Sequence, residues 1–580
     1  MKSNSKWISS LALGLSLCLS PAVAKSGERD QFYENVSRLN KVLLEINRKY
    51  VEEVNADDLT DAAISGLKNI LDPHTAVFSP DDYNDLKVST EGEFGGLGIT
   101  IAIRDNILTI IAPLHNTPAY RMGLLAGDRI VKIGGESTEG IAIEDAVDKL
   151  RGKIGTNVTI HIAREGEADL LEFEITRGKI VIQSVPYHGM VTPEIGYVRV
   201  ASFAKNTGRD IQKAIQNLQS QGMKKFILDL RFNPGGLLTQ AIELGDMFLE
   251  KDQMVVSTKG RIQETEAYSE NPPLISKDVP MVVLIIGGSA SASEIVSGAL
   301  QDWDRAIVMG QTSFGKGSVQ TIYPLDHEGH ALKMTTAFYY LPMGRCINKA
   351  ENGIQGLDVS IKADSASTDS TEITFKTKNG RTVYSDGGIT PDIEIEPKTL
   401  NWLEQLVERK NFFFKFVVKT RPKVEANGVK ITYDWKVPKS MIEDFKSFIK
   451  KDTNFTEASI GSDKMIEMLE ELLEKEENIP SDSSKISSDA VGSKLLALKK
   501  ALQDRRQKAL DVQEDYLARG IKREFLLAVL GDQASTQFNL ESDQQVKEAI
   551  NVLNDGEKYR KILSGELDLK KAQPKEKPEE

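Results

Sequence analysis

The chain has 580 residues, of which 40% are hydrophobic and 27% are charged, and its formal net charge at pH 7 is −12. This composition predicts a globular protein of about three or four domains and excludes collagen-like and wholly disordered chains. The negative charge argues against a nucleic-acid partner, and two cysteines are too few for a disulfide scaffold or a cysteine-based zinc module.

Residues 1–24 have the pattern of a secretory signal peptide. Two lysines precede an apolar run over residues 8–20, and Ala22-Val23-Ala24 is a small-x-small cleavage site. No later run approaches the roughly 18–20 apolar residues of a membrane span. We therefore expect an exported, periplasmic protein, with attachment to the membrane periphery as a further possibility to test.

Residues 25–87 are predicted to form an N-terminal helical region. Apolar residues recur there at spacings of four and three, which is typical of one face of a helix: Phe32, Val36, Leu39, Leu43, Ile46 and Tyr50. The stripe predicts a helix that packs on its own domain. A seam between two copies of the chain is the alternative.

Residues 88–180 change to short β-rich runs. Two strands are predicted around a turn at Arg104-Asp105-Asn106, followed by a helix over residues 143–150 and a closing strand over 158–163. From 181 to 400 apolar strands, such as residues 226–230 and 281–286, alternate with helices. This alternation predicts an α/β layer, in which sites form at the carboxyl ends of the strands.

Residues 401–569 are charged and helical in pattern, with a Ser/Asp-rich linker near 477–492, and residues 570–580 are predicted to be a disordered tail. No catalytic signal is found in this part of the chain. The fold class expected for the whole is therefore multidomain α+β.

A serine-rich segment follows the second buried strand. Gly287-Gly288 is followed by serines at 289, 291 and 293, where a helix is predicted to begin. The unpaired N–H groups of a helix N-terminus can stabilise the oxyanion of acyl transfer, although serine is also a common helix cap. The local pattern leaves open which serine attacks.

A nucleophilic serine needs a base, and histidine and lysine are the alternatives. None of the six histidines lies in a catalytic motif: His74, His115, His161, His188, His327 and His330. In the turn that contains the last two, no carboxylate is placed to complete a metal site. A Ser-His-Asp triad therefore stays open but unsupported.

Lys316 lies between Gly315 and Gly317, ahead of an apolar strand, and Gln320 falls on the same face of that strand. Burial would lower the pKa of such a lysine and make it a base, although a surface lysine in a glycine turn has the same local pattern. The segment also resembles the P-loop pattern of nucleotide-binding proteins, but Gly317 stands where Ser or Thr would hold magnesium, and an exported protein has no ATP supply.

Asn233-Pro234-Gly235-Gly236 ends another buried strand and can offer N–H groups to an oxyanion.

Five motifs in order closely resemble the carboxyl-terminal processing peptidases, or tail-specific proteases, a Ser–Lys serine protease family, over about residues 30–400. They are Asp72-Pro73-His74, Gly95-Gly96-Leu97-Gly98-Ile99, Arg231-Phe232-Asn233-Pro234-Gly235-Gly236, Gly288-Ser289-Ala290-Ser291-Ala292-Ser293-Glu294 and Gly315-Lys316-Gly317-Ser318-Val319-Gln320. The resemblance implies Ser291 as nucleophile, Lys316 as general base and Gln320 as its orienter. It also implies oxyanion donors at the N–H of Ala292 and at one glycine N–H near Gly235 and Gly236.

The same resemblance makes residues 88–180 a PDZ domain, in which Gly96, Leu97, Gly98 and Ile99 would bind the carboxylate of a peptide tail. It also makes residues 181–400 the protease core. An insertion near 348–387 and the region after 400 depart from the compact family pattern. Neither touches the catalytic motifs in the sequence, so we expect them to affect access, oligomeric state or activation.

The function predicted is therefore that of an exported serine endopeptidase that cleaves proteins near their C-termini without a metal or cofactor. The partners expected are protein or peptide C-terminal tails, a second copy through N-terminal or C-terminal helices, and an activating adaptor, with no nucleic acid. A non-catalytic PDZ scaffold that binds C-termini is the alternative.

Overall fold

The computed structural model describes residues 24–68, 70–349, 373–385, 387–452, 468, 493–495, 497–498, 500–501 and 508–567. The predicted signal peptide up to residue 23, most of the insertion, the linker and the tail lie outside the described residues. The chain divides into two compact units, one of residues 1–78 with 322–334 and one of residues 79–321 with 335–580.

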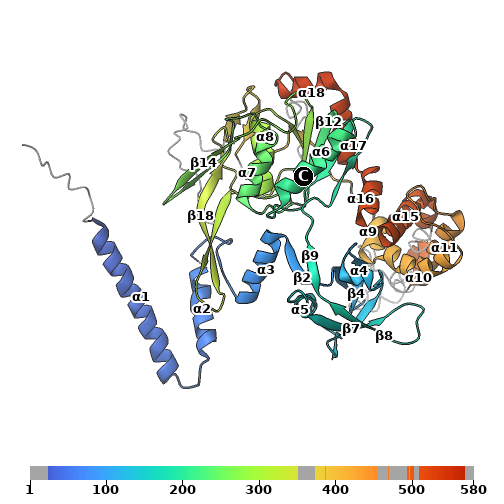
Figure 1. Ribbon diagram of the computed structural model, residues 1–580, viewed down its shortest axis with the longest axis horizontal. Coiled ribbons are helices and arrows are strands. Elements are labelled where there is room, and N and C mark those ends of the chain that lie inside the picture. Colours follow the sequence, from blue (N-terminus) through green and yellow to red (C-terminus); the bar gives the residue numbers. More distant parts are fainter. Residues whose placement is uncertain are drawn as a thin grey trace, which may run out of the picture. The chain divides into compact units, whose positions relative to one another are not determined.

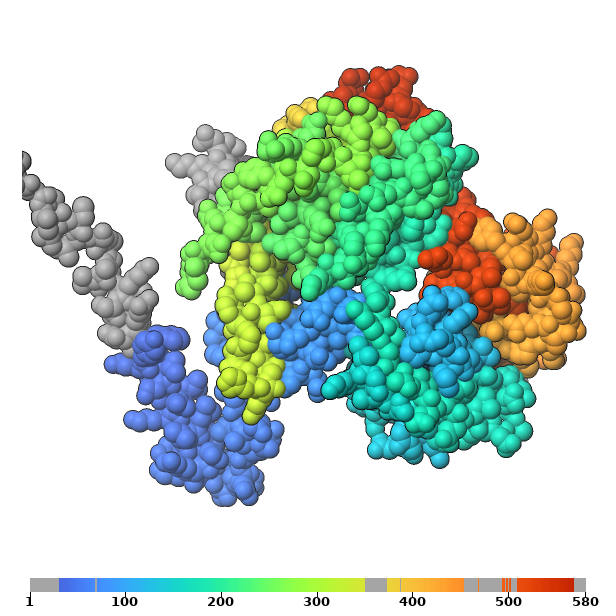
Figure 2. Space-filling view, in the orientation of Figure 1, coloured from blue at the N-terminus to red at the C-terminus, as the bar shows by residue number. Residues whose placement is uncertain are grey.

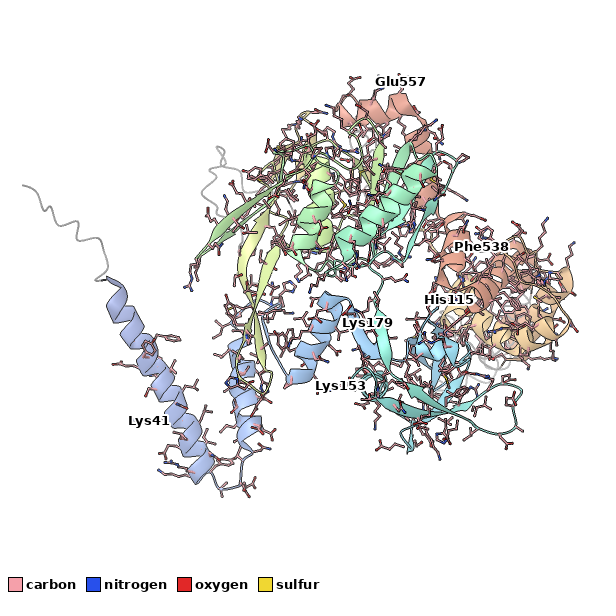
Figure 3. The ribbon with its side chains drawn as sticks, viewed as in Figure 1. Lys41, His115, Lys153, Lys179, Phe538 and Glu557 are labelled. Atoms are coloured by element: carbon pink, nitrogen blue, oxygen red, sulfur yellow. The ribbon has the colours of Figure 1, made fainter. Side chains whose placement is uncertain are left out.

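The first unit contains two helices, α1 (Ala24–Lys49) and α2 (Ala56–Lys68), and a short strand β1 (Ala76–Phe78). β1 pairs antiparallel with the beginning of β18 (Ala331–Tyr340), with Ala76 opposite Lys333. The predicted apolar stripe of α1 is covered only in part: Leu43 and Ile46 are half-buried, whereas Phe32, Val36 and Leu39 are 64%, 45% and 46% exposed. Side chains project freely from α1 in Figure 3, where Lys41 is labelled. The expectation that the stripe packs on its own domain is therefore met only at Leu43 and Ile46.

The second unit begins with α3 (Pro80–Glu91) and a β-rich module. Its sheet runs in the order β3-β4-β5-β7-β8, and Asp105 and Asn106 have left-handed φ angles of 48° and 64° in the predicted turn between β3 and β4. The elements of the module and its flanking ribbon are β2 (Glu93–Gly96), β3 (Ile99–Arg104), β4 (Ile107–Pro113), α4 (Pro118–Arg121), β5 (Arg129–Ile133), β6 (Glu136–Ser137), α5 (Ile143–Leu150), β7 (Asn157–Ala163), β8 (Leu171–Thr176) and β9 (Gly178–Val181).

The predicted α/β layer has a sheet in the order β10-β11-β12-β15-β16-β21, parallel except where β10 meets β11. Three helices pack on one face of this sheet (Figure 1). These elements are β10 (Tyr187–Met190), β11 (Ile195–Arg199), α6 (Thr207–Ser220), β12 (Lys225–Asp229), α7 (Leu238–Asp246), β15 (Met281–Ile285), α8 (Ala292–Asp302), β16 (Ile307–Gly310) and β21 (Ile393–Glu394).

A second sheet lies beside this layer. β13 (Met254–Gly260) pairs with β14 (Glu264–Tyr268) and with the end of β18, where Thr258 lies opposite Tyr339. β17 (Ser318–Pro324) also pairs with β18, and β19 (Thr374–Lys376) forms a separate hairpin with β20 (Thr382–Tyr384).

The C-terminal third is helical, as predicted, and its helices form two groups. The first group buries an aromatic-rich core that includes Phe413, Phe416 and Phe445, and it consists of α9 (Trp402–Arg409), α10 (Phe412–Ala426), α11 (Lys439–Lys451), α15 (Glu514–Leu530) and α16 (Asp532–Leu540). It contacts the β-rich module, since Lys415 of α10 forms an ion pair with Asp105 at 2.9 Å. The orange and red atoms of this group adjoin the blue-to-teal atoms of the module in Figure 2.

The second group, α17 (Gln544–Asn554) and α18 (Gly556–Leu563), covers the other face of the α/β sheet. Val283 and Ile285 of β15 face the core with α6–α8, whereas Val282 and Leu284 face the core with α17 and α18. Successive residues of a strand point to opposite faces, so a strand covered on both faces is apolar throughout. Among the described helices, none is long and apolar enough to cross a bilayer.

Candidate active site

Ser291 lies at the carboxyl end of the central strands, immediately before α8. Its backbone angles are φ 55° and ψ −112°, and its side chain is buried with 6% exposure. A non-glycine residue in this region of φ/ψ space is strained by about 1–3 kcal/mol, and such strain concentrates at functional sites. A sharp, strained turn from a strand to a helix presents the nucleophilic serine in α/β-hydrolases.

The three serines that the sequence could not separate have different environments. Ser289 Oγ donates to the carbonyl of Leu230 at 2.8 Å and accepts from the N–H of Ile286. Ser293 Oγ donates to the carbonyl of Asn233 at 2.9 Å. The hydroxyls of Ser289 and Ser293 thus hold neighbouring loops in place, whereas the Ser291 side chain faces the start of its own helix, in a capping box with Glu294.

The hydroxyl of Tyr339 lies 3.3 Å from Ser291 Oγ. Tyr339 belongs to β18 and is only 5% exposed, and burial raises the pKa of its phenol above the ordinary value. This phenol is therefore a neutral hydroxyl beside the serine.

Glu294 joins the serine turn to the lysine loop. Its buried carboxylate accepts from the N–H of Ser291 at 2.8 Å and from the N–H of Lys316 at 2.9 Å. It also accepts from the N–H of Gly315 and from Ser313 Oγ, at 2.6 and 2.5 Å. Burial raises the pKa of the Glu294 carboxyl, against the opposing effect of these four hydrogen bonds. One side chain thus connects the backbones of the two residues predicted to react.

Lys316 is half-buried in the loop between β16 and β17. The glycines on either side of it allow close backbone contacts: a Cβ at Gly317 would lie 2.5 Å from the N atom of Asn348, and a Cβ at Gly315 would lie 2.8 Å from the carbonyl carbon of Gly387. Asn348 Oδ1 also accepts from the Gly317 N–H at 3.1 Å. The two ends of the insertion near 348–387 therefore pack on the lysine loop, although the insertion does not interrupt any of the quoted motifs in the sequence.

Gln320 lies on β17, and its side chain is half-buried. Its amide nitrogen donates to Ser318 Oγ at 3.1 Å and to Thr335 Oγ1 at 2.9 Å. Its buried Oε1 has no hydrogen-bond partner in the described part of the chain. These contacts fix the orientation of the Gln320 amide and leave its Oε1 as an acceptor to which an amine could donate a hydrogen bond.

The glycine loop after β12 lies against the serine turn. A Cβ at Gly235 would lie 2.8 Å from Ser291 Cβ and 3.0 Å from the N atom of Ala292. The N–H of Gly235 donates to Asn233 Oδ1 at 2.9 Å, so this donor is occupied. The N–H groups of Gly236 and Ala292 have no partner among the residues that the structure describes.

Arg231 connects this loop to the C-terminal helices. Its guanidinium contacts Asp229 at 2.7 Å and Asp543, the residue before α17, at 2.8 Å. Its Nη1 also donates to Gln545 at 3.0 Å. The region after 400 therefore contacts the segment that begins at Arg231, although it is more than 300 residues away in the sequence.

The histidines of the second unit do not reach the serine. His115 packs against Tyr120 with tilted rings whose centres are 4.7 Å apart, and it is labelled in Figure 3. His161 lies 3.4 Å from Glu172, and His188 is an exposed residue of β10. No hydrogen bond joins any of these three to Ser291, so within this unit the structure offers no Ser-His pair.

In the turn between β17 and β18, we expected no carboxylate placed beside a histidine to complete a metal site, and the structure differs from this expectation. The carboxylates of Asp326 and Glu328 and the ring of His330 present ligand atoms within 4.8 Å of one another, so carboxylates do stand beside the histidine. Asp326 accepts from three backbone N–H groups of its own turn and from His330 Nδ1 at 2.7 Å. Local turn hydrogen bonding explains this exposed cluster.

The predicted peptide-binding loop precedes β3. Leu97 is buried, and the carbonyls of Leu97 and Gly98 accept from the N–H groups of Ala119 and Leu114, both at 2.9 Å. The N–H groups of Leu97 and Gly98 have no partner in the described chain. β3 is the edge strand of its sheet among the described strands. The loop therefore leaves donors free beside an unpaired edge.

Sequence reasoning missed two contributors to the site. Glu294 carried a local signal, because a serine followed three residues later by glutamate is the pattern of a capping box. Tyr339 carried none, since it is 48 residues from Ser291 in the chain and reaches it only through the pairing of distant strands.

Comparison with protein families identifies three segments. Residues 194–361 match peptidase family S41, residues 109–164 match the PDZ domain, and residues 403–553 match the C-terminal helical domain of probable PDZ-proteases. These matches confirm that the chain contains a PDZ domain and a protease domain, as predicted.

Two proteins named as carboxy-terminal processing proteases are similar to this chain over longer stretches of sequence. The carboxy-terminal-processing protease of Bartonella bacilliformis is 40% identical over 346 residues, which cover 59% of this chain and 79% of that protein. The carboxy-terminal processing protease CtpA of Bacillus subtilis is 30% identical over 427 residues, which cover 73% and 89%. Among solved structures, the photosystem II D1 C-terminal processing protease is 26% identical over 62% of this chain and 86% of its own, with a TM-score of 0.35, which carries no argument about the site.

Proposed function

Because the chain belongs to the carboxy-terminal processing proteases, a family of serine endopeptidases with a PDZ domain, we propose that Ser291 is its nucleophile and Lys316 its general base. The observation that carries the proposal is the shared carboxylate of Glu294, which binds the N–H groups of both residues. The strained, buried backbone of Ser291 adds to it.

In the proposed reaction the neutral amine of Lys316 takes the proton from Ser291 Oγ, and Oγ attacks the carbonyl carbon of the scissile peptide bond. The carbonyl electrons move to the oxygen, which accepts hydrogen bonds from the N–H groups of Ala292 and Gly236. Gly236 is favoured over Gly235 because the latter N–H is already bonded to Asn233. The lysine returns the proton to the leaving amine, and water then hydrolyses the acyl-enzyme.

Gln320 is proposed to orient the lysine amine. Two hydroxyls hold its amide nitrogen, and its Oε1 is buried without a described partner. An acceptor in that state costs free energy until a donor reaches it, so an ammonium or amine at this position would be stabilised.

The catalytic proposal is tested with single variants assayed on an internally quenched peptide. Ser291→Ala and Lys316→Arg should each lower kcat/KM by about 10³-fold or more, because the first removes the nucleophile and the second puts a permanent cation in place of the base. Ser297→Ala, on the same helix, should stay active. Substantial cleavage by the folded Ser291→Ala protein would overturn the proposal and place the nucleophile elsewhere, whereas absence of cleavage by the wild-type protein would favour the non-catalytic scaffold.

The PDZ domain binds peptide C-termini in its family, and we propose the loop of Gly96, Leu97, Gly98 and Ile99 as the site that holds the terminal carboxylate. The free N–H groups of the loop would bind the carboxylate, and the peptide would extend edge strand β3. A peptide with a free C-terminus should bind more tightly than the same peptide with a C-terminal amide.

Gly98→Ala tests the loop directly. Gly98 has φ 77°, and a Cβ there would lie 2.3 Å from Thr117 Cβ. Gly123→Ala is the matched control, since Gly123 has φ 79° and no atom within 4 Å of such a Cβ. Only Gly98→Ala should abolish the preference for a free carboxylate. Equal preference in both variants would place tail binding elsewhere.

Export and assembly complete the proposal. Cleavage after Ala24 predicts that the exported, periplasmic or membrane-peripheral protein begins at Lys25, which N-terminal sequencing would detect.

The exposed stripe of α1 supports a homodimer, so Val36→Glu should lower the sedimentation coefficient if two copies pair there. An activating adaptor would appear as a protein whose addition raises kcat/KM of the purified enzyme.

A further inference from the structure

The side chain of Tyr339 approaches the proposed nucleophile from a different sheet. Its hydroxyl oxygen is 3.3 Å from Ser291 Oγ, and the hydroxyl of Tyr339 has no other hydrogen-bond partner among the described residues. The contact is long for two hydroxyls, but hydrogen bonds in catalytic sites are often long without substrate and shorten in the transition state.

The backbone of Tyr339 is fixed to the lysine loop. Its N–H donates to the carbonyl of Gly317, the residue after Lys316, at 2.7 Å. It also lies opposite Thr258 in the pairing of β18 with β13, and its ring packs in the core beside α8. Tyr339 therefore holds the loop of the base with its main chain and reaches the nucleophile with its side chain.

We propose that Tyr339 is a further catalytic residue, whose hydroxyl donates a hydrogen bond to Ser291 Oγ and directs the serine proton toward Lys316. The inference rests on the proposed function of Ser291 and Lys316. A phenol is a stronger donor than an aliphatic alcohol. When the phenol occupies one lone pair of Oγ, the O–H bond of Ser291 points away from Tyr339 and is available to the base.

The charge balance of the step explains why this contact matters. The Oγ–H bond breaks, the proton moves to the lone pair of the lysine amine, and the electrons left on Oγ form the bond to the substrate carbon. The phenol proton stays on Tyr339 throughout. The hydrogen bond is strongest while Oγ carries partial negative charge, both when Oγ attacks and when it leaves during hydrolysis of the acyl-enzyme.

The test removes the hydroxyl and leaves the ring. Tyr339→Phe should lower kcat by about 10- to 100-fold, the effect expected from one hydrogen bond to a charged group, with KM within about twofold of wild type. Tyr340→Phe is the matched control, since it removes the next hydroxyl on the same strand and should leave kcat unchanged. The thermal unfolding midpoint of each variant is measured alongside.

Replacement of Tyr339 by 3-fluorotyrosine restores a hydroxyl on the same ring and should return kcat to near the wild-type value. A merely structural role would instead lower the unfolding midpoint or raise KM. If Tyr339→Phe does not fold, the fluorotyrosine protein still reports on the hydroxyl through its pH profile. Fluorine lowers the pKa of the phenol, so loss of the donor should make kcat fall at a lower alkaline pH than in the wild type, and an unchanged alkaline limb would overturn the proposal.

The outcomes separate this inference from the proposed function. If Ser291→Ala and Lys316→Arg are inactive and Tyr339→Phe has wild-type or higher kcat, the role of Tyr339 is overturned and the catalytic pair stands. If Ser291→Ala or Lys316→Arg stays active, the catalytic pair itself fails and the inference fails with it.

Discussion

At the scale of single residues, the site depends on one buried carboxylate. Glu294 accepts four hydrogen bonds, two of them from the N–H groups of the proposed nucleophile and base. A carboxylate can accept at both oxygens, whereas an amide of the same shape presents an NH₂ group to at least one donor. The residue thus fixes the spacing of the two loops without itself touching the substrate.

Glu294→Gln is expected to lower kcat by about 10- to 100-fold and to leave KM nearly unchanged, because an amide NH₂ would face backbone N–H groups. Glu404→Gln is the matched control: Glu404 is also buried and also accepts from the first residue of its helix motif, Asn401, at 3.0 Å. That variant should lose stability without losing kcat. Equal kcat in wild type and Glu294→Gln would contradict the positioning role.

The pH dependence follows from the direction of the pKa shift. Burial raises the pKa of the Glu294 carboxyl above 4.5, so the folded protein takes up this proton more readily than the unfolded chain. The contribution of this group to the free energy of unfolding is therefore present at low pH and is lost as the pH rises through the raised pKa. Activity should change in the opposite sense, because protonation of Glu294 removes an acceptor and the proposed base Lys316 acts only when its amine is neutral. A fall in kcat in acid without a parallel fall in the unfolding midpoint is the expected observation.

At the scale of elements, the start of α17 is coupled to the glycine loop. Asp543 caps α17, since its Oδ1 accepts from the N–H groups of Gln545 and Val546, and its Oδ2 forms an ion pair with Arg231. Burial lowers the pKa of Arg231, but Asp229 and Asp543 raise it more, so the guanidinium stays charged. The loop that leads to Gly235 and Gly236 is thus anchored by a residue more than 300 positions later in the chain.

Asp543→Asn separates these two roles, because asparagine caps a helix as well as aspartate does but carries no charge. We expect a loss of about 1–3 kcal/mol in the free energy of unfolding and a measurable fall in kcat, as Arg231 loses one of its carboxylates. Asp555→Asn is the control, since Asp555 caps α18 by accepting from the N–H of Lys558 and is exposed. A kcat equal to wild type in Asp543→Asn would show that the loop does not depend on α17.

At the scale of the whole molecule, α17 and α18 act as one layer of the protease core. The sheet buries Val282, Leu284 and Met309 against Val546, Val552 and Leu553 of the C-terminal helices. Tyr559 of α18 ties the layers together, since its hydroxyl accepts from the N–H of Met281 and donates to its carbonyl, at 2.9 and 3.1 Å. Without this layer an apolar face of the sheet would be open to water.

Val552→Asp should therefore destabilise the protease core and not only the C-terminal helices. Val552 is fully buried in α17, and a carboxylate there lacks any partner, so we expect a loss of about 3–5 kcal/mol. Lys547→Asp places the same side chain on the exposed face of α17 and should change stability by less than about 0.5 kcal/mol. Melting of the α/β core at the wild-type temperature in the Val552→Asp protein, measured by hydrogen exchange of β15, would contradict the shared core.

Local patterns were sufficient for much of the chain. The turn at Asp105 and Asn106, the helix over 143–150 and the apolar strand at 281–286 follow from neighbours in the sequence, because turn chemistry and apolar periodicity are short-range. The motifs around Ser291 and Lys316 could be quoted for the same reason. The apolar spacing also predicted helix α1 correctly. Such spacing shows which face of a helix is apolar, but it does not show what covers that face.

What the sequence alone determined, then, is part of the set of helices and strands, the family and the residues proposed to react. What only the tertiary structure decided is which of the three serines lies beside Tyr339, that one carboxylate joins two loops, and that the ends of the insertion and the C-terminal helices touch the loops of Lys316 and Arg231. These contacts join residues that are far apart in the chain. Their geometry depends on the packing of whole layers, and no local sequence pattern records it.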